Sequence, residues 1–311
     1  MKTLVLGAGA IGGYFGGRLA EAGSDVTFLV RPRRREVLER DGLVVESPKG
    51  NMKLPVKTVL AEELKPGYDI VLFTCKAYDL DSAMDAIAPA MKGAALVPML
   101  NGIAHMEKLD ARFGAANVMG GTAQINVMLR PDGSILHADP LQRLVYGERN
   151  KSKSPRAQAF ADELGKSKID WVLSEDVGLE MWEKVVFLSA LAAITCLFRG
   201  NVREIMGAPG GREAMQRTLD ANRLIAIAEG YTPRPQAIER ATARLTDPEG
   251  LWSASMLRDL EAGGQVESDH IVGWMLERAI KHGVDVTMLS MAYTHLKTYE
   301  NRRKADRLPK R

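Results

Sequence analysis

Residues 1–31 read MKTLVLGAGAIGGYFGGRLAEAGSDVTFLVR, which is the pattern of a strand, a glycine turn, a helix and a second strand. The apolar run from Lys2 to Leu6 is the first strand, and a helical stretch extends from Ala10 to Ala22. The second strand runs from Asp25 to Val30. This order of elements is the opening of a nucleotide-binding α/β domain, and the rest of the chain is interpreted outward from it.

Three glycines follow the first strand in the spacing G-x-G-x-x-G. Gly7 permits a tight turn, Gly9 lets the backbone approach a pyrophosphate, and Gly12 lets the helix pack closely on the strand. The helix N-terminus then offers N–H groups and the positive end of its dipole to the phosphates. We therefore expect a dinucleotide to contact the residues of this turn, namely Gly7, Ala8, Gly9, Ala10, Ile11 and Gly12.

The end of the second strand indicates which dinucleotide binds. A site for NAD usually places Asp or Glu there, to accept a hydrogen bond from the ribose 2′-OH. This chain has Arg31 instead, and after Pro32 it continues with Arg33, Arg34 and Arg35. Guanidinium groups bind a 2′-phosphate, which a carboxylate would repel, so we expect NADP(H) with Arg31 at the selecting position. The alternative is a solvated basic turn at the start of the next helix.

The composition is that of an ordinary soluble protein, and 311 residues are enough for two domains. A net charge of +3 does not favour a nucleic-acid partner, and the basic segment 301–311 is interpreted as a solvated terminus. Cys75 and Cys196 lie in apolar surroundings, so we expect reduced thiols in the core. We expect no signal peptide, no membrane span and a cytoplasmic location. No metal site is predicted.

Alternating strands and helices continue through the first half of the chain. The apolar runs from Tyr68 to Cys75 and from Ala94 to Leu100 predict strands buried on both faces of a parallel sheet, with a helix from Ala77 to Met91 between them. A hairpin-like insertion is expected from Gly42 to Val56. This alternation predicts a Rossmann-like, doubly wound α/β sheet. The strands between Asn117 and Gly147 are expected to extend that sheet in antiparallel fashion.

The pattern becomes helical beyond Asp176. We expect helices over Val177 to Leu197, Gly211 to Gly230, Leu251 to Leu260, Val266 to His282 and Val286 to Arg303. The chain is therefore expected to form an NADP-binding domain at residues 1–175 and an all-helical substrate and catalytic domain at residues 176–311. Apolar residues from Met288 to Tyr299 could supply the face of a homodimer, and packing inside the helical domain explains them equally well.

Two polar residues stand just past buried strands of the expected sheet. Lys76 follows one strand and Asn101 follows the next. In open α/β sheets the ligand binds outside the carboxyl ends of the strands, so we expect both side chains beside the cofactor. Taken singly, Lys76 is also an ordinary loop lysine and Asn101 an ordinary turn residue.

Lys184 is the residue best suited to acid–base chemistry. It lies within MWEKVVFLSALAAITCLF, whose apolar content suggests a buried helix. Desolvation would lower the pKa of this lysine and make it a proton donor near neutral pH, whereas a nearby carboxylate such as Glu267 would stabilise its ammonium form. The alternatives are a surface lysine paired with Glu180 and a helix N-terminal charge at Glu267.

These segments resemble the ketopantoate reductases (2-dehydropantoate 2-reductases) along almost the whole chain. The matching stretches are GAGAIGGYFG from Gly7, the arginine at position 31, CKAYD around Lys76, LNGI around Asn101, MWEKVVF around Lys184, and SASMLRDLEAGGQVESDHIVG from Ser253. The resemblance implies that Lys184 is the general acid, that Ser255 binds the substrate carboxylate, and that Glu267 holds the substrate hydroxyl or the catalytic lysine. It also implies that Lys76 and Asn101 lie beside the nicotinamide and the substrate.

One departure concerns the substrate. Family members with established ketopantoate activity resemble W-x-K-x-x-x-N-x-x-x-N, and this chain has Leu188 and Ala192 at the two Asn positions. Loss of polar contacts to a substrate can lead to its rejection, and the neighbouring Ser189 points elsewhere on a helix.

The resemblance implies NADPH-dependent reduction of a 2-oxo acid, foremost 2-dehydropantoate to pantoate in pantothenate biosynthesis. Two alternatives are a more apolar oxo acid and a non-catalytic NADP-binding sensor. The presence of Lys184, Ser255 and Glu267 together argues against the sensor.

Overall fold

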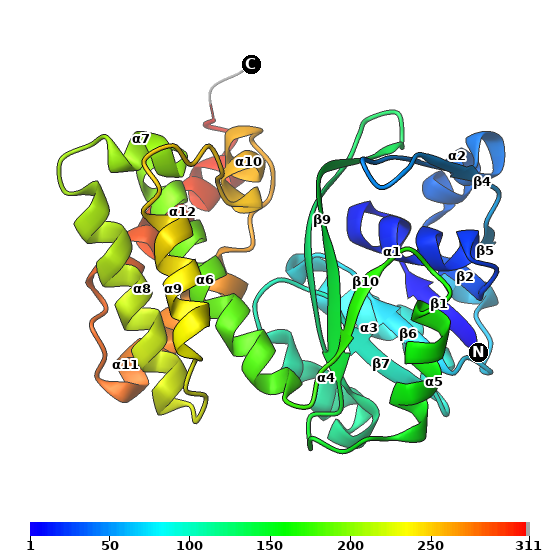
Figure 1. The fold of residues 1–311 in the computed structure, drawn as a ribbon. Coiled ribbons are helices and arrows are strands. Elements are labelled where there is room, and N and C mark those ends of the chain that lie inside the picture. Colours follow the sequence, from blue (N-terminus) through cyan, green and yellow to red (C-terminus); the bar gives the residue numbers. More distant parts are fainter. Residues whose placement is uncertain (309–311) are drawn as a thin grey trace. The chain divides into compact units, whose positions relative to one another are not determined.

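The structure is a computed structural model that describes residues 1–308 (Figure 1). The chain divides into two compact units, which are described separately. Unit 1 contains Met1–Leu100 and His105–Glu180. Unit 2 contains the short segment Asn101–Ala104 and the described chain from Met181 onward. The passage from unit 1 to unit 2 after Glu180 lies inside a long helix.

The first sheet of unit 1 is parallel throughout and confirms the predicted Rossmann-like fold (Figure 1). Its strands, in spatial order, are β5 (Lys57–Val59), β2 (Asp25–Leu29), β1 (Lys2–Leu6), β6 (Ile70–Phe73) and β7 (Ala95–Pro98). The chain moves from the central β1 to β2 on one side and later to β6 on the other. The strand order therefore reverses between β1 and β6, which is where such sheets bind ligands. All residues of β6 and β7 are buried, as expected for strands covered on both faces.

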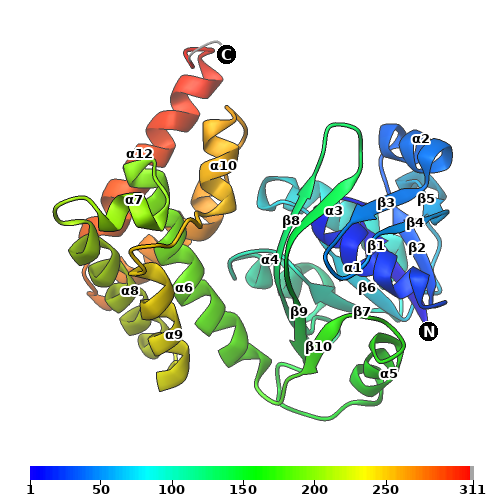
Figure 2. The ribbon, with the colours of Figure 1, turned by 45° about the horizontal axis from the view of Figure 1, so that its top comes forward.

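The later strands of unit 1 form a second sheet and do not extend the first, so that expectation was wrong. Their antiparallel pairing was right, because β8 (Gly120–Leu129) and β9 (Ile135–Gly147) form a long hairpin that is drawn in green in Figure 2. The second sheet contains β10 (Asp170–Leu173), β9 (Ile135–Gly147), β3 (Leu43–Glu46) and β4 (Met52–Leu54), with β8 (Gly120–Leu129) paired to β9. The expected hairpin from Gly42 to Val56 is the β3–β4 pair.

Helix α1 (Ala10–Glu21) explains why a second sheet is present. A Cβ on Gly16 would lie 2.8 Å from the Phe28 ring in the first sheet. A Cβ on Gly13 would lie 2.3 Å from Ile135 Cδ1 in the second sheet. Glycines on two sides of α1 thus let a sheet approach each side closely, and α1 is buried along most of its length. The strands after residue 117 cover the second side of α1.

The remaining helices of unit 1 flank these sheets. They are α2 (Pro32–Asp41), α3 (Leu80–Ile87), α4 (His105–Phe113) and α5 (Pro155–Leu164). The single helix expected from Ala77 to Met91 is divided into a 3₁₀ turn, α3 and a second 3₁₀ turn. Pro89 lies in that second turn and cannot donate a helical hydrogen bond. Cys75 is half-buried, so its expected core position was wrong, whereas Cys196 in unit 2 is buried.

The described part of unit 2 is helical, which confirms the predicted helical C-terminal region (Figures 1 and 2). Its helices are α6 (Val177–Phe198), α7 (Val202–Met206), α8 (Gly211–Ala228), α9 (Pro235–Leu245), α10 (Ser255–Glu261), a π-helical turn (Asp269–Gly273), α11 (Trp274–His282) and α12 (Thr287–Lys304). Helices α7 and α9 were not predicted, although Asn201 and Glu204 form a capping box before α7 and Pro235 begins α9.

Helix α6 is the main apolar element of unit 2. Among the described helices, α6 is the one whose length and mean hydropathy would suit a membrane span. However, 67% of its most apolar 18-residue stretch is buried inside the structure. We interpret α6 as a core helix.

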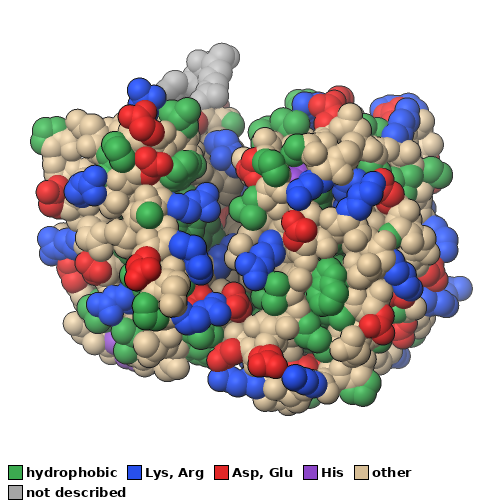
Figure 3. Space-filling model, in the orientation of Figure 1, with side chains coloured by type: hydrophobic (Ala, Val, Ile, Leu, Met, Phe, Trp, Pro, Cys, Tyr) green, Lys and Arg blue, Asp and Glu red, His purple; other side chains and the backbone are tan. Residues whose placement is uncertain are grey.

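Within α12, Leu289, Leu296 and Tyr299 are buried, and a homodimer stays a prediction. Residues 301–304 belong to α12, whereas residues 309–311 of the basic segment lie outside the described chain. Figure 3 shows Lys and Arg side chains intermixed with Asp and Glu over the visible face.

Candidate functional site

The glycine turn after β1 has the geometry of a phosphate cradle. Gly7 has a φ of +86°, a conformation that favours glycine. A Cβ on Gly12 would lie 2.2 Å from the Gly7 carbonyl oxygen and 2.4 Å from Thr74 Oγ1, so only glycine fits there. A Cβ on Gly9 would meet nothing within 4 Å. The side-chain position at Gly9 therefore faces open space.

The N-terminus of α1 has the right charge for the same ligand. Gly9 occupies the N-cap position, where no side chain caps the helix, and the first turn has no acidic residue. The N–H groups of the first turn and the positive end of the helix dipole are therefore available to an anion. These features fit the pyrophosphate of a dinucleotide.

Residues at the ends of β6 and β2, the two strands that flank β1, lie along the same edge as the glycine turn. Thr74, just past β6, donates a hydrogen bond of 2.6 Å from Oγ1 to the Leu6 carbonyl oxygen at the end of β1. Lys76 follows two residues later and is half-buried at the start of a 3₁₀ turn. Arg31 follows β2 as the N-cap residue of α2. The structure thus brings Lys76 and Arg31 to the carboxyl edge of the sheet.

The four arginines after β2 have different environments. The side chain of Arg31 is 77% exposed, and its Nη2 lies 3.3 Å from Asp79 Oδ2. Arg33 is also exposed. An exposed ion pair of this kind contributes little to stability, so Arg31 can exchange Asp79 for a phosphate at small cost. Arg31 and Arg33 are therefore the two arginines of this group that face solvent.

Arg34 and Arg35 have structural contacts instead. Arg34 donates from Nε to the Ala8 carbonyl oxygen at 2.9 Å and from Nη1 to the Gly133 carbonyl oxygen at 2.8 Å. This side chain joins the glycine turn to the tip of the β8–β9 hairpin. Arg35 forms a forked pair with Glu63. Of the four arginines that the sequence suggested for binding a 2′-phosphate, Arg31 and Arg33 therefore remain as candidates.

Lys184 and Asn101 meet within unit 2. Lys184 lies half-buried on α6, and its Nζ donates a hydrogen bond of 3.1 Å to Asn101 Oδ1. Burial disfavours the ammonium and lowers the pKa of Lys184 to about 8. A lysine with such a pKa is protonated at neutral pH and releases its proton more readily than an exposed lysine. The pair thus provides a proton donor oriented by an amide.

Two further predicted site residues also belong to unit 2. Glu267 is 7% exposed and lies two residues before the π-helical turn, with Ser268 between them. Ser255 is half-buried and is the first residue of α10. Lys184 donates its described hydrogen bond to Asn101. A pairing of Lys184 with Glu267 stays a prediction.

The two positions that depart from the family pattern have different surroundings. Glu180, Lys184 and Leu188 follow one another at four-residue intervals on α6, and all three are half-buried. Leu188 therefore continues the partly accessible stripe of Lys184. Ala192 is only 1% exposed and belongs to the core, and so does Ser189. Of the two replacements, Leu188 is the partly accessible one.

His270 was missed by the sequence analysis. Its ring packs against Gly102, the residue after Asn101. The segment reads as the start of an ordinary amphipathic helix, and the π-helical turn that carries His270 is evident only in the structure.

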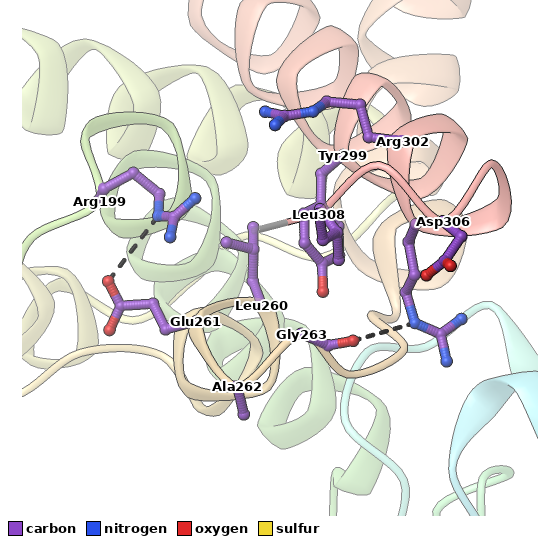
Figure 4. Close-up of a pocket in the computed structure, with 10 residues that line it drawn as sticks. Arg199, Leu260, Glu261, Ala262, Gly263, Tyr299, Arg302, Asp306 and Leu308 are labelled. Atoms are coloured by element: carbon purple, nitrogen blue, oxygen red, sulfur yellow. Dashed lines mark hydrogen bonds and ion pairs between the residues drawn. The ribbon is translucent and has the colours of Figure 1, made fainter. Parts of the chain in front are cut away.

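A separate cavity of about 660 Å³ lies in unit 2 (Figure 4). It is lined by the ends of α10 and α12 and by Arg199, and the predicted site residues do not line it. Arg199 lies 3.8 Å from Glu261, and Arg303 Nε donates to the Gly263 carbonyl oxygen at 3.1 Å. Its arginines are thus engaged by groups of the protein itself.

Comparison with known proteins identifies the family. The family model described as ketopantoate reductase PanE/ApbA matches residues 3–151, and its C-terminal counterpart matches residues 176–300. The chain belongs to the ketopantoate reductase family. Members of the ketopantoate reductase family are nicotinamide-dependent oxidoreductases, so the prediction of an enzyme of this class is confirmed.

Relatives of this ketopantoate reductase family member match it from end to end. An uncharacterised oxidoreductase, YkpB, of Bacillus subtilis is 35% identical and covers 96% of this chain and 99% of its own. A 2-dehydropantoate 2-reductase of a Nostoc species is 26% identical, and the match covers 99% of this chain and 98% of the relative. The crystal structure of a 2-dehydropantoate 2-reductase from Geobacter metallireducens is similar, with a TM-score of 0.87 at 26% sequence identity. The match covers 96% of this chain and 99% of that chain.

Proposed function

We propose that this protein reduces a 2-oxo acid to the corresponding 2-hydroxy acid with NADPH. The observation that carries the proposal is the Lys184–Asn101 hydrogen bond, which orients a half-buried ammonium of lowered pKa. Ketone reduction needs such a group, because negative charge develops on the carbonyl oxygen as hydride reaches the carbonyl carbon.

Four residues of this chain have separate roles in the proposed reaction. The reduced nicotinamide, when bound, supplies the hydride. Lys184 Nζ donates a proton to the carbonyl oxygen, so that the ketone becomes a hydroxyl and the lysine is left neutral. Asn101 orients Lys184, Ser255 holds the substrate carboxylate, and Glu267 holds the new hydroxyl or Lys184.

NADPH is favoured over NADH by the residues at the end of β2. Arg31 stands where an NAD site would carry a carboxylate, and both Arg31 and Arg33 are exposed. A 2′-phosphate there would accept charge-assisted hydrogen bonds from two guanidinium groups. Gly7 to Gly12 hold the pyrophosphate, and Lys76 lies beside the cofactor on the same edge of the sheet.

The substrate proposed first is 2-dehydropantoate, with pantoate as the product for pantothenate biosynthesis. Full-length similarity to proteins named 2-dehydropantoate 2-reductase supports this substrate. The second candidate is an oxo acid with a more apolar side chain. The observation that favours it is Leu188, an apolar side chain on the accessible stripe of Lys184 where an Asn is expected.

Replacement of Lys184 tests whether the protein is a catalyst or a sensor. We expect Lys184→Ala to lower kcat by about 10²- to 10⁴-fold, because the proton donor is lost, while NADPH still binds. Stopped-flow turnover and NADPH fluorescence titration measure the two quantities. Lys281→Ala is the matched control, since Lys281 is an exposed lysine of unit 2 that pairs with Glu229. A wild type that binds NADPH but turns over no oxo acid would support the sensor instead.

A further inference from the structure

The turn that carries Asn101 rests on the side chain of His270. Gly102 has a φ of +79°, and a Cβ placed on it would lie 3.0 Å from His270 Cδ2 and 3.3 Å from His270 Nε2. The same Cβ would lie 3.2 Å from the His270 carbonyl oxygen. The backbone of Gly102 is thus in close contact with both the ring and the main chain of His270. Asn101, one residue earlier, accepts the hydrogen bond of Lys184.

His270 lies on an unusual element. Residues Asp269–Gly273 form a π-helical turn between Glu267 and α11, and Ile271 N donates to the Glu267 carbonyl oxygen at 3.1 Å. Single π turns inserted in helices are rare and occur frequently at functional sites. Glu267 therefore lies two residues before this turn, and His270 lies within it.

The far side of the π turn is fixed to α12. Tyr293 Oη donates to Asp269 Oδ1 at 2.6 Å, and Lys297 Nζ lies 3.0 and 3.1 Å from the two Asp269 carboxylate oxygens. Ser268 donates to Glu300. A Cβ on Gly273 would lie 2.8 Å from the Tyr293 ring, so helix and turn pack tightly. The turn is a rigid support, because hydrogen bonds and close packing both hold it.

The Asn101 segment has no regular structure of its own. Asn101–Ala104 belongs to no helix or strand among the described residues, although it is grouped with unit 2. Its conformation must come from what it packs against, and at Gly102 that is His270. Removal of the ring would leave the carbonyl as the remaining His270 contact of Gly102, and the permissive backbone of Gly102 would then allow other conformations.

We propose that His270 is a positioning residue, which holds the Asn101–Gly102 turn so that the Asn101 amide stays within hydrogen-bond distance of Lys184. This role rests on the proposed function of Lys184 as proton donor. His270 acts through packing, and its ring need not touch substrate or cofactor. A small displacement of an orienting group is enough to slow a reaction that depends on alignment.

The first test is structural and needs no turnover. We expect a crystal structure of His270→Ala to show Asn101 Oδ1 beyond hydrogen-bond distance from Lys184 Nζ. In His270→Phe, which keeps a ring against Gly102, the hydrogen bond should remain. A hydrogen bond of unchanged length in His270→Ala would overturn the proposal. If the bond is lost in that variant while the wild type reduces no oxo acid, the positioning role stands and the proposed function fails.

The second test is kinetic. We expect His270→Ala to lower kcat by about ten- to a hundredfold, with the KM for NADPH unchanged and with recovery of most activity in His270→Phe. His282→Ala is the matched control, because His282 is a half-buried histidine of the same unit whose Nε2 lies 2.6 Å from Glu229. Equal losses in the Ala and Phe variants would assign the effect to the imidazole nitrogens and would overturn a role through packing. An unchanged kcat in His270→Ala would also overturn it.

Discussion

Lys184 carries a charge in surroundings that disfavour one. Burial lowers the pKa of Lys184 from its ordinary range to about 8, so the ammonium predominates below that pH and the neutral amine above it. Since the ammonium is the proposed proton donor, we expect kcat/KM for oxo-acid reduction to be constant at neutral pH. It should fall about tenfold per pH unit above about pH 8. A profile that stays flat up to the ordinary pKa of lysine would contradict this role.

Asn101 should affect the same titration. Its Oδ1 accepts a hydrogen bond from the ammonium form of Lys184 and therefore favours that form. In Asn101→Ala the alkaline limb of the kcat/KM profile should move to lower pH, which a pH titration of reduction rates measures. A limb that moves to higher pH would show that Asn101 does not stabilise the ammonium.

Arg31 should decide between the two nicotinamide dinucleotides. We expect Arg31→Ala to raise the KM for NADPH about tenfold or more while the KM for NADH changes little, because only NADPH has the 2′-phosphate. Initial rates with each cofactor measure this preference. Arg40→Ala is the control, since Arg40 is an exposed arginine of α2 that pairs with Asp41. Equal effects of Arg31→Ala on both cofactors would contradict a phosphate contact.

Gly9 and Gly12 lie in one turn but should respond differently to the same change. An added methyl at Gly12 would overlap the Gly7 carbonyl and Thr74, so we expect Gly12→Ala to lower the free energy of unfolding by about 1–3 kcal/mol. Gly9→Ala meets open space at a φ of −79°, so its stability should be nearly unchanged while NADPH binds more weakly. Thermal unfolding and NADPH titration of both variants separate the two roles.

At the scale of one helix, α6 should determine the preferred substrate. Leu188 lies on the Lys184 stripe, and we expect Leu188→Asn to raise kcat/KM for 2-dehydropantoate relative to oxo acids with apolar side chains. Ala192→Asn should instead destabilise the protein by about 1–3 kcal/mol, because it buries an amide in the core. A substrate panel and thermal unfolding of the two variants test this. An unchanged substrate ratio in Leu188→Asn would show that the Leu188 side chain does not meet the substrate.

Helix α1 shows how far the sequence predicts the elements of the fold. The spacing of Gly7, Gly9 and Gly12 correctly predicted the turn, the helix and its packing on the first sheet. Gly13 and Gly16 are not part of that motif. Gly13 is a glycine at a position where Ile135 of the second sheet packs against α1. Alternating apolar residues identified the strands after residue 117 but carry no information on which sheet they join. The partner of a strand depends on contacts distant in sequence, and this is why the second sheet was missed.

At the scale of the whole molecule, the sequence singles out candidate residues but not the contacts that each of them makes. Lys184 and Asn101 were both singled out, from a helix and from the end of a strand, but their hydrogen bond joins positions 83 residues apart and appears only in the structure. The sequence placed Arg31 at the selecting position and Arg34 in the same basic group, and tertiary contacts show that Arg34 is a structural arginine whereas Arg31 is exposed. His270 had no local signal, because its contact with Gly102 depends on how the chain folds.

The most direct measurement is the oxidation of NADPH, followed by its absorbance, when the purified protein is mixed with 2-dehydropantoate and then with a panel of other 2-oxo acids. NADH serves as the control cofactor. The proposed function predicts rapid NADPH consumption with at least one 2-oxo acid, with formation of the 2-hydroxy acid and much slower consumption of NADH. Tight NADPH binding without turnover of any 2-oxo acid would contradict it and leave a protein that binds the cofactor without using it.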